Sequence, residues 1–163
     1  MTPTTALTLP YGNGEYLFDL KLPQLAELQE KRGAGVFKIY GRVLAGRYIF
    51  DGEPLAIPAE GEAFAEDLVE TIRLGLIGGG EGLVDGQRVP VSALLAKTLV
   101  ERYTASAPLR EAWSVAAAIL GARVEGYVPP KKKARAKPVT KTSSSTSRRS
   151  SRTRPSSEPI GES

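Results

Sequence analysis

The sequence predicts an α+β protein that is mainly helical, with about five short helices, a small N-terminal β-hairpin and a disordered basic C-terminal tail. Apolar residues alternate with polar ones near the N-terminus, and five later segments repeat them at helical spacing. The segment after Pro130 has almost no large apolar side chains, so it cannot bury enough surface to order itself. We divide the chain into a globular domain at residues 1–128 and a tail at residues 129–163.

The hairpin is expected around Tyr11-Gly12-Asn13-Gly14, because the apolar positions alternate on both sides of it and Asn-Gly is a strong turn signal. Pro10 suits the end of an edge strand. A first helix is expected to begin at Leu22-Pro23 and to end at Gly33 and Gly35.

A second short helix is expected from Val36 to Leu44, followed by a loop from Gly46 to Ala59 that prolines interrupt. A third helix is expected from about Gly61 to Ile77, with one wide apolar stripe. The three glycines at positions 78–80 are interpreted as a flexible stop of this helix.

The segment from Leu83 to Val89 fits either a small hairpin over Asp85-Gly86 or a plain loop. A fourth helix is expected from Val91 to Tyr103, with no clear cap at its start. A fifth is expected from near Pro108 to Gly121. It is apolar nearly all round, which is typical of a helix at the centre of a core or under a partner.

Charge is divided unevenly along the chain. Residues 1–130 contain 12 Lys and Arg against 16 Asp and Glu, a net of −4, whereas residues 131–163 contain 10 against 2, a net of +8. Such a tail is expected to bind phosphates non-specifically by counterion release, and its lack of aromatics argues against base stacking. The predicted polyanion-binding residues are Lys131, Lys132, Lys133, Arg135, Lys137, Arg148, Arg149, Arg152 and Arg154.

The composition also limits the chemistry. The chain has no cysteine and no histidine, which removes disulfides, thiolate and imidazole metal ligands, and the commonest general base. The first residues lack the features of a secretory signal, and no apolar run approaches the ~18 residues that span a bilayer. We therefore expect a cytoplasmic protein that makes no membrane contact, is not an enzyme and holds no metal or other cofactor.

Two patterns suggest a ligand site, and both are incomplete. Gly75 and Gly80 have the G-x-x-x-x-G spacing of a P-loop, but Glu81-Gly82 stands where Lys-Ser or Lys-Thr is required, so nothing would meet the phosphates. Carboxylates recur every four residues at Glu62, Glu66 and Glu70. Paired carboxylates can hold Mg²⁺ or hydrolyse glycosides, but opposite an apolar stripe they are typical of a solvated helix face.

Leu74 and Ile77 fall off the apolar stripe of the third helix. Burial by neighbouring helices is the commoner explanation, and the alternative is a docking point beside a flexible glycine loop. Under the alternative, the predicted partner-binding residues are Ile72, Arg73, Leu74, Leu76, Ile77 and Gly78.

Four segments together resemble a known family: Phe18–Lys31 followed by Gly33, then Glu70–Gly80, Leu99–Tyr103 and Pro108–Trp113. Over about residues 5–127, their order and spacing resemble the gene transfer agent family of tail proteins, which are tail-assembly chaperones of siphophage-like particles, sometimes described as tail tube proteins. The resemblance implies an assembly factor of a prophage or gene transfer agent. It would coat the tape measure protein, bring tail tube proteins to it, and be left out of the mature particle.

Two alternatives stay open: a small nucleic-acid-associated protein that binds through its basic tail, and a structural tail tube subunit. The tail itself lies outside the resemblance. Lys131-Lys132-Lys133 is what an A-rich slippery site would encode, as in phage chaperones made in two lengths by a −1 frameshift. An ordinary basic tail in one reading frame is the simpler interpretation.

Overall fold

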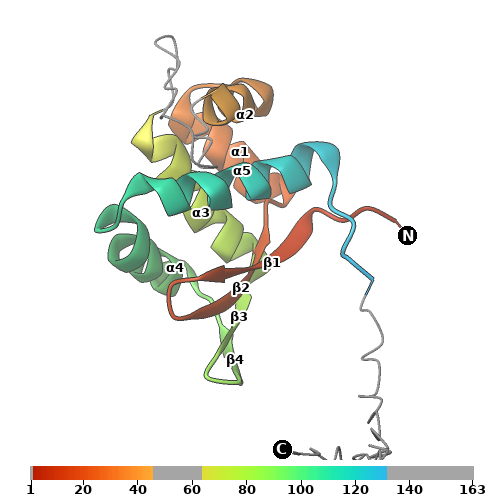
Figure 1. The fold of residues 1–163 in the computed structure, drawn as a ribbon. Helices are drawn as coiled ribbons and strands as arrows, with labels where there is room; N and C mark the ends of the chain where they lie inside the picture. Colours follow the sequence, from red (N-terminus) through yellow and green to blue (C-terminus); the bar gives the residue numbers. More distant parts are fainter. Residues whose placement is uncertain (1, 46–63, 132–163) are drawn as a thin grey trace, which may run out of the picture. The chain divides into compact units, whose positions relative to one another are not determined.

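The computed structural model describes residues 2–45 and 64–131. The chain divides into a unit at residues 1–130 and a second unit at residues 131–163. The elements of the described residues all lie in the first unit (Figure 1). In order they are β1 (Ala6–Tyr11), β2 (Gly14–Asp19), α1 (Leu22–Arg32), α2 (Val36–Ala45), α3 (Ala65–Gly79), β3 (Glu81–Val84), β4 (Gln87–Pro90), α4 (Ala93–Val100), the π-helical segment η1 (Glu101–Ala105) and α5 (Leu109–Glu125).

This architecture confirms the predicted α+β fold class with five helices and an N-terminal hairpin. The predicted loop at 46–59 and the predicted disorder after Lys131 lie outside the described residues.

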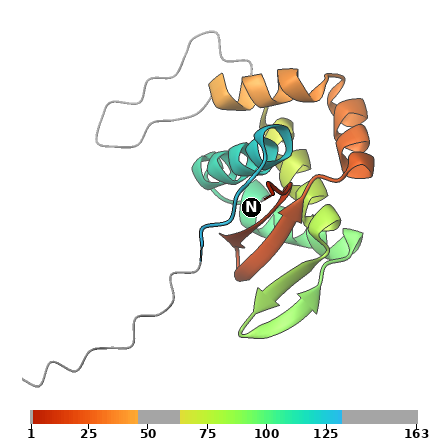
Figure 2. The ribbon, with the colours of Figure 1, turned by 90° about the vertical axis from the view of Figure 1, so that its right-hand side faces the viewer.

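Two hairpins join into one antiparallel sheet with the strand order β1-β2-β3-β4. The first turns at Gly12-Asn13, one residue earlier than the Asn-Gly pair, because Tyr11 pairs with Gly14. The second turns at Asp85-Gly86, whose φ angles of 50° and 76° suit a tight two-residue turn, so this segment is a hairpin and not a plain loop. The two hairpins meet where Tyr16 pairs with Gly82 (Figure 2).

The edges of the sheet are β1 and β4, and each carries a proline, Pro10 and Pro90. A proline has no N–H to donate to an added strand, so both edges are poor templates for further pairing.

The core lies between one face of the sheet and the helices α3 and α5, which pack against β2 and against each other (Figure 1). Buried apolar side chains recur at every second position along most of β1 and β2, as the sequence predicts, but the alternation ends at Asp19, which is buried between the fully buried Phe18 and Leu20. Helix α3 also packs against α1 and α4, so neighbours surround most of it. The breadth of this contact explains why both sides of α3 are apolar near its end.

Two predicted helix ends and one prediction about a cap are wrong. Helix α4 does have a cap, because the Ser92 hydroxyl accepts a hydrogen bond from the Leu95 N–H at 3.1 Å. Helix α5 does not end at Gly121 but continues to Glu125. A Cβ at Gly121 would lie 3.2 Å from the Tyr40 hydroxyl oxygen, so this glycine admits Tyr40, which in turn donates to Glu125 at 2.7 Å. The predicted range of the third helix ends too early, since α3 continues two residues past Ile77.

The glycine run at the end of α3 is a packing feature and not the flexible stop that the sequence suggested. A Cβ at Gly78 would lie 1.8 Å from the Asp19 carbonyl oxygen, and one at Gly79 would lie 1.8 Å from that of Leu17. Only glycine fits so close to the backbone of β2. The third glycine, Gly80, ends the helix in the left-handed conformation with a φ of 72°.

Candidate functional site

The predicted docking point on α3 is mostly part of the core. Leu74 has no exposed surface, and Ile77 is partly buried against the core. The prediction of an exposed patch is therefore wrong for the buried residues, and the alternative of burial by neighbours holds. The residues of that prediction that the fold buries are Ile72, Leu74, Leu76 and Gly78.

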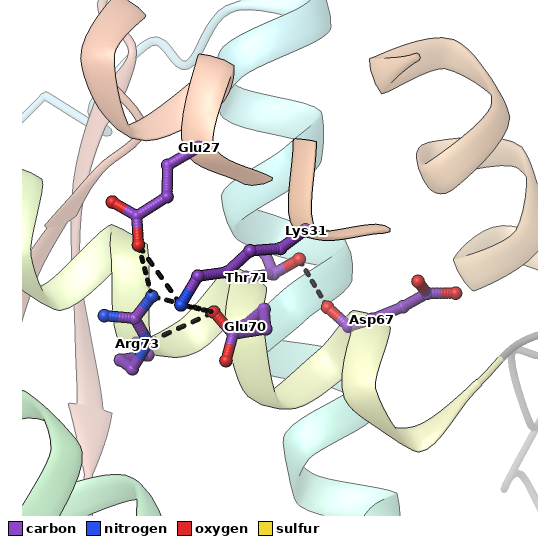
Figure 3. Close-up of polar contacts among 6 residues, drawn as sticks. All are labelled: Glu27, Lys31, Asp67, Glu70, Thr71 and Arg73. Atoms are coloured by element: carbon purple, nitrogen blue, oxygen red, sulfur yellow. Dashed lines mark hydrogen bonds and ion pairs between the residues drawn. The ribbon is translucent and has the colours of Figure 1, made fainter. Parts of the chain in front are cut away.

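Arg73 is the one charged residue of the predicted set, and it lies in a network of ion pairs between α1 and α3 (Figure 3). Its guanidinium donates to Glu27 at 2.7 Å and to Glu70 at 2.8 Å. Lys31 approaches the same two carboxylates at 3.3 and 3.6 Å. Two cations and two carboxylates therefore neutralise one another at the junction of the two helices.

The ion-pair network changes the pKa of the Glu27 carboxyl. The hydrogen bond from Arg73 lowers the pKa of the Glu27 carboxyl and outweighs the opposing effect of burial, and the weaker effect of Lys31 acts in the same direction as that of Arg73. Glu27 therefore stays ionised to a lower pH than an isolated glutamate would.

A buried carboxylate anchors α1 and α2 to α3. Asp67 has no exposed surface, and its Oδ1 accepts from Arg32 Nε at 2.7 Å and from Arg42 Nη2 at 2.9 Å. Its Oδ2 accepts from the N–H of Phe64 at 3.2 Å, and the Phe64 ring lies against both guanidinium groups, 5.8 and 5.4 Å from its centre. Removing either partner of a buried ion pair is costly, so we assign this cluster a structural role. It fixes the helix that carries Lys31.

A groove of about 650 Å³ runs between α3 and α4, with α1 at its rim. Its apolar surface comes from Val69 on α3 and from Ala93, Leu94 and Val100 on α4. Leu94 is 75% exposed, so most of a large apolar side chain lies in water. The charged residues that line the groove are Lys31, Glu70, Arg73, Lys97 and Glu101.

No protein-family model, curated protein or solved structure matches this chain. The α3–α4 groove combines an apolar surface with charged residues at its rim. An apolar surface of this kind with a charged rim is the usual form of a site for a partner helix, since the apolar part supplies affinity and the rim supplies orientation.

A second hollow of about 620 Å³ lies between the β1–β2 turn, η1 and the start of α5. Its lining is more mixed, with the exposed charges of Arg102 and Glu111 close to Ser114 and the rings of Tyr11 and Tyr103. It contains no large exposed aliphatic side chain comparable with Leu94. We therefore take the α3–α4 groove as the candidate site.

The remaining predicted patterns can be placed in the part of the chain that the structure describes. Gly78 and Gly79, which lie within the P-loop spacing, pack their backbone against β2, so that stretch of backbone is not free to cradle a phosphate. Of the carboxylate row, Glu66 is exposed, Glu70 is bound by Arg73, and Glu62 lies outside the described residues. Lys131 is exposed, and the other predicted tail cations lie outside the described residues.

Neither a metal-binding group nor a membrane-spanning helix is found among the described residues. In residues 2–45 and 64–131, no group of three or more Asp and Glu side chains is placed to hold a metal ion. The helices seen there are all too short or too polar to cross a bilayer.

Of the nine described residues that line the groove, only Arg73 belongs to the partner site predicted from the sequence; the eight that the prediction lacks include Lys31, Val69, Leu94 and Lys97. The sequence did contain a signal for Leu94. Adjacent residues of a helix point about 100° apart, so a helix that packs on one side cannot bury Leu94 and Leu95 equally. Leu95 packs against the core and Leu94 faces outward. The other missed residues could not be found from the sequence, because the groove depends on how α1, α3 and α4 lie side by side.

Proposed function

We propose that this chain is a non-enzymatic tail-assembly chaperone of a prophage or gene transfer agent that binds the tape measure protein through the α3–α4 groove. One observation carries the proposal: Leu94 is 75% exposed beside an apolar groove about 650 Å³ in volume. Beside the groove, this side chain enlarges the apolar surface that a partner helix would cover.

The resemblance of residues 5–127 to the gene transfer agent tail proteins supplies the identity of the partner. A tape measure protein is long, apolar and helical, and it needs a cover until the tail tube proteins enclose it. An amphipathic helix laid in a groove between two helices buries its apolar face and leaves its polar face in water. The groove offers the apolar surface that such an interaction needs.

Co-expression of the chain with the tape measure protein of the same genome tests the proposal. Leu94→Asp is expected to abolish co-purification, because it places a charge where the partner's apolar face would dock. Leu22→Asp is the matched control, since Leu22 is 68% exposed but does not line the groove. The proposal fails if the two variants co-purify the tape measure protein equally well.

We further propose that the protein acts in the cytoplasm of the bacterial host and is absent from the mature particle. The alternative of a tail tube subunit requires it to be retained. An immunoblot of purified particles is expected to detect tail tube protein but not this chain. Its presence at a constant ratio to the tail tube, or rings and tubes formed by the chain alone in electron micrographs, would favour the structural subunit.

The net charge of +8 over residues 131–163 favours a second activity, the non-specific binding of polyanions by the tail. Deleting these residues is expected to abolish binding to heparin or duplex DNA while leaving co-purification with the tape measure protein intact. Loss of both activities would mean that the tail takes part in partner binding.

A further inference from the structure

We infer that the outward face of α2 is a self-association surface, and that its occupant is a second copy of this chain, packed antiparallel across a two-fold axis. The inference goes beyond the proposed function and uses another surface, since none of the described residues that line the α3–α4 groove belongs to α2. It follows from the apolar character of this face, from a glycine within it and from the charges beside it.

The outward face of α2 is apolar, whereas the solvent-facing side of a helix is usually charged. Phe37 is 77% exposed and Leu44 is 39% exposed, and the exposed Gly41 lies between them. The spacing of four and three residues places all three on one side of the helix. The other side packs into the core through Ile39 and Val43. Helix α2 therefore has an apolar side in the core and a second apolar side in water.

No neighbour within the described chain explains the glycine at the centre of this face. A Cβ at Gly41 would meet nothing within 4 Å, although glycine inside a helix costs about 1 kcal/mol relative to alanine. The other glycines inside the described helices lie at positions 75, 78, 79 and 121, and a Cβ at each would come within 3.2 Å of another element. Helical glycines in this fold thus mark places where another part of a chain comes close. At Gly41, a second chain supplies that close approach.

The charges beside the face are complementary to those of a second copy. Lys38 lies about 100° around the helix from Phe37, and Arg42 lies on the same flank, one turn further on. Arg42 holds Asp67 at 2.9 Å, so the first turn of α3, which includes the exposed Glu66, lies beside the C-terminal half of α2. Lys38 and Glu66 both lack an ion-pair partner among the described residues. Each copy therefore presents a free cation near one half of the face and a free anion near the other.

A two-fold axis at Gly41 brings these groups together. In an antiparallel pair that crosses at the two glycines, Phe37 of each copy packs against Leu44 of the other. The axis reverses the helix direction and keeps the flanks on the same side, so each Lys38 faces the half that carries Glu66 of the other copy. A parallel pair would instead set the two lysines level with each other and away from Glu66. The face is thus self-complementary in packing and in charge, which an unrelated partner does not require.

The size of the face sets the strength of the dimer. A single helix of 10 residues buries less than the ~800 Å² per partner that is usual in a stable interface. We therefore expect a dissociation constant on the order of 100 µM. The chain is then monomeric at the low micromolar concentrations of a thermal melt and mostly dimeric near ~1 mM.

Sedimentation velocity of the full chain between about 10 µM and 1 mM tests the inference, in ~0.15 M salt to screen repulsion between the basic tails. Phe37→Asp is expected to raise the dissociation constant about tenfold or more at an unchanged Tm, because this side chain is exposed in the single copy. Leu22→Asp is the matched control, since Leu22 is 68% exposed but belongs to α1, and it should dimerise like the wild type.

A charge exchange distinguishes a second copy from any other occupant. Lys38→Glu and Glu66→Lys are each expected to raise the dissociation constant about threefold, and the double variant should return it to within about twofold of the wild type. Such rescue requires the two residues to meet across the two-fold axis. A chain that stays monomeric at about 1 mM, a dimer that Phe37→Asp leaves intact, or a double variant that is not rescued would each overturn the inference.

Discussion

Gly78→Ala is expected to destabilise the fold, although alanine is the better helix former. Gly78 lies in the last turn of α3, where a Cβ would meet the Asp19 carbonyl oxygen at 1.8 Å and its carbon at 3.0 Å. An ordinary contact to a Cβ begins at 3.4 Å, so helix and strand would have to separate by on the order of 1.5 Å. The obstacle is strand backbone, which cannot rotate away as a flexible side chain could.

The size of the effect follows from two opposed contributions. Alanine in place of glycine favours a helix by about 1 kcal/mol. Overpacking a closely packed interior costs about 1–3 kcal/mol, and a clash with backbone lies at the upper end or beyond. We therefore expect a net loss of about 2 kcal/mol in the free energy of unfolding, which corresponds to a fall in Tm of roughly 8 °C for a domain of this size.

Thermal and urea denaturation followed by circular dichroism measure this change. Gly41→Ala is the matched control, because Gly41 is an exposed helical glycine of α2 with no atom within 4 Å of its Cβ position. It is expected to raise Tm by roughly 2–4 °C through helix propensity alone. If Gly78→Ala proves as stable as the wild type, α3 does not depend on close contact with β2 and the packing argument is wrong.

Three further predictions concern polar groups. Asp67→Asn is expected to lower the free energy of unfolding by about 3 kcal/mol in urea titrations, because it leaves Arg32 and Arg42 without their carboxylate. Burial raises the pKa of the Tyr11 hydroxyl above its usual 10.0, so its contribution to stability is present below pH ~10 and is lost as the pH rises further; Tyr11→Phe should lose stability less steeply in alkali. The pKa of Glu27 is lowered, so its contribution to stability changes with pH in the opposite direction to that of Tyr11. Its contribution is present above pH ~4.5 and is lost as the pH falls below it, so Glu27→Gln should show a weaker decline in acid.

The parts of the fold that the sequence predicted correctly have local causes. The first hairpin, the start of α1 at Leu22-Pro23 and its end at Gly33 all depend on residues within a few positions of one another. The cap at Ser92 was missed although serine is among the preferred capping residues, so the signal was present and was not used.

The parts that were missed are non-local. The pairing of Tyr16 with Gly82 joins two hairpins that are far apart in the sequence, and neither hairpin contains a signal for the other. The groove has the same origin, since Lys31, Val69 and Leu94 come from three helices. The outward position of Leu94 is set by which side of α4 meets α3, and a helical pattern with leucines at adjacent positions leaves that choice open.

Gly78 and Gly79 of α3 explain both why the predicted docking residues are buried and where the groove lies. Because Gly78 and Gly79 let the end of α3 approach β2, that end becomes core, and Leu74 is buried instead of exposed. The surface that α3 offers to a partner then lies nearer its start, at Val69 and Arg73. Two variants separate the roles: Gly78→Ala should lose partner binding only together with a fall in Tm, whereas Leu94→Asp should lose it at an unchanged Tm. A Leu94→Asp protein that unfolds at a much lower temperature would mean that Leu94 supports the fold and not the partner.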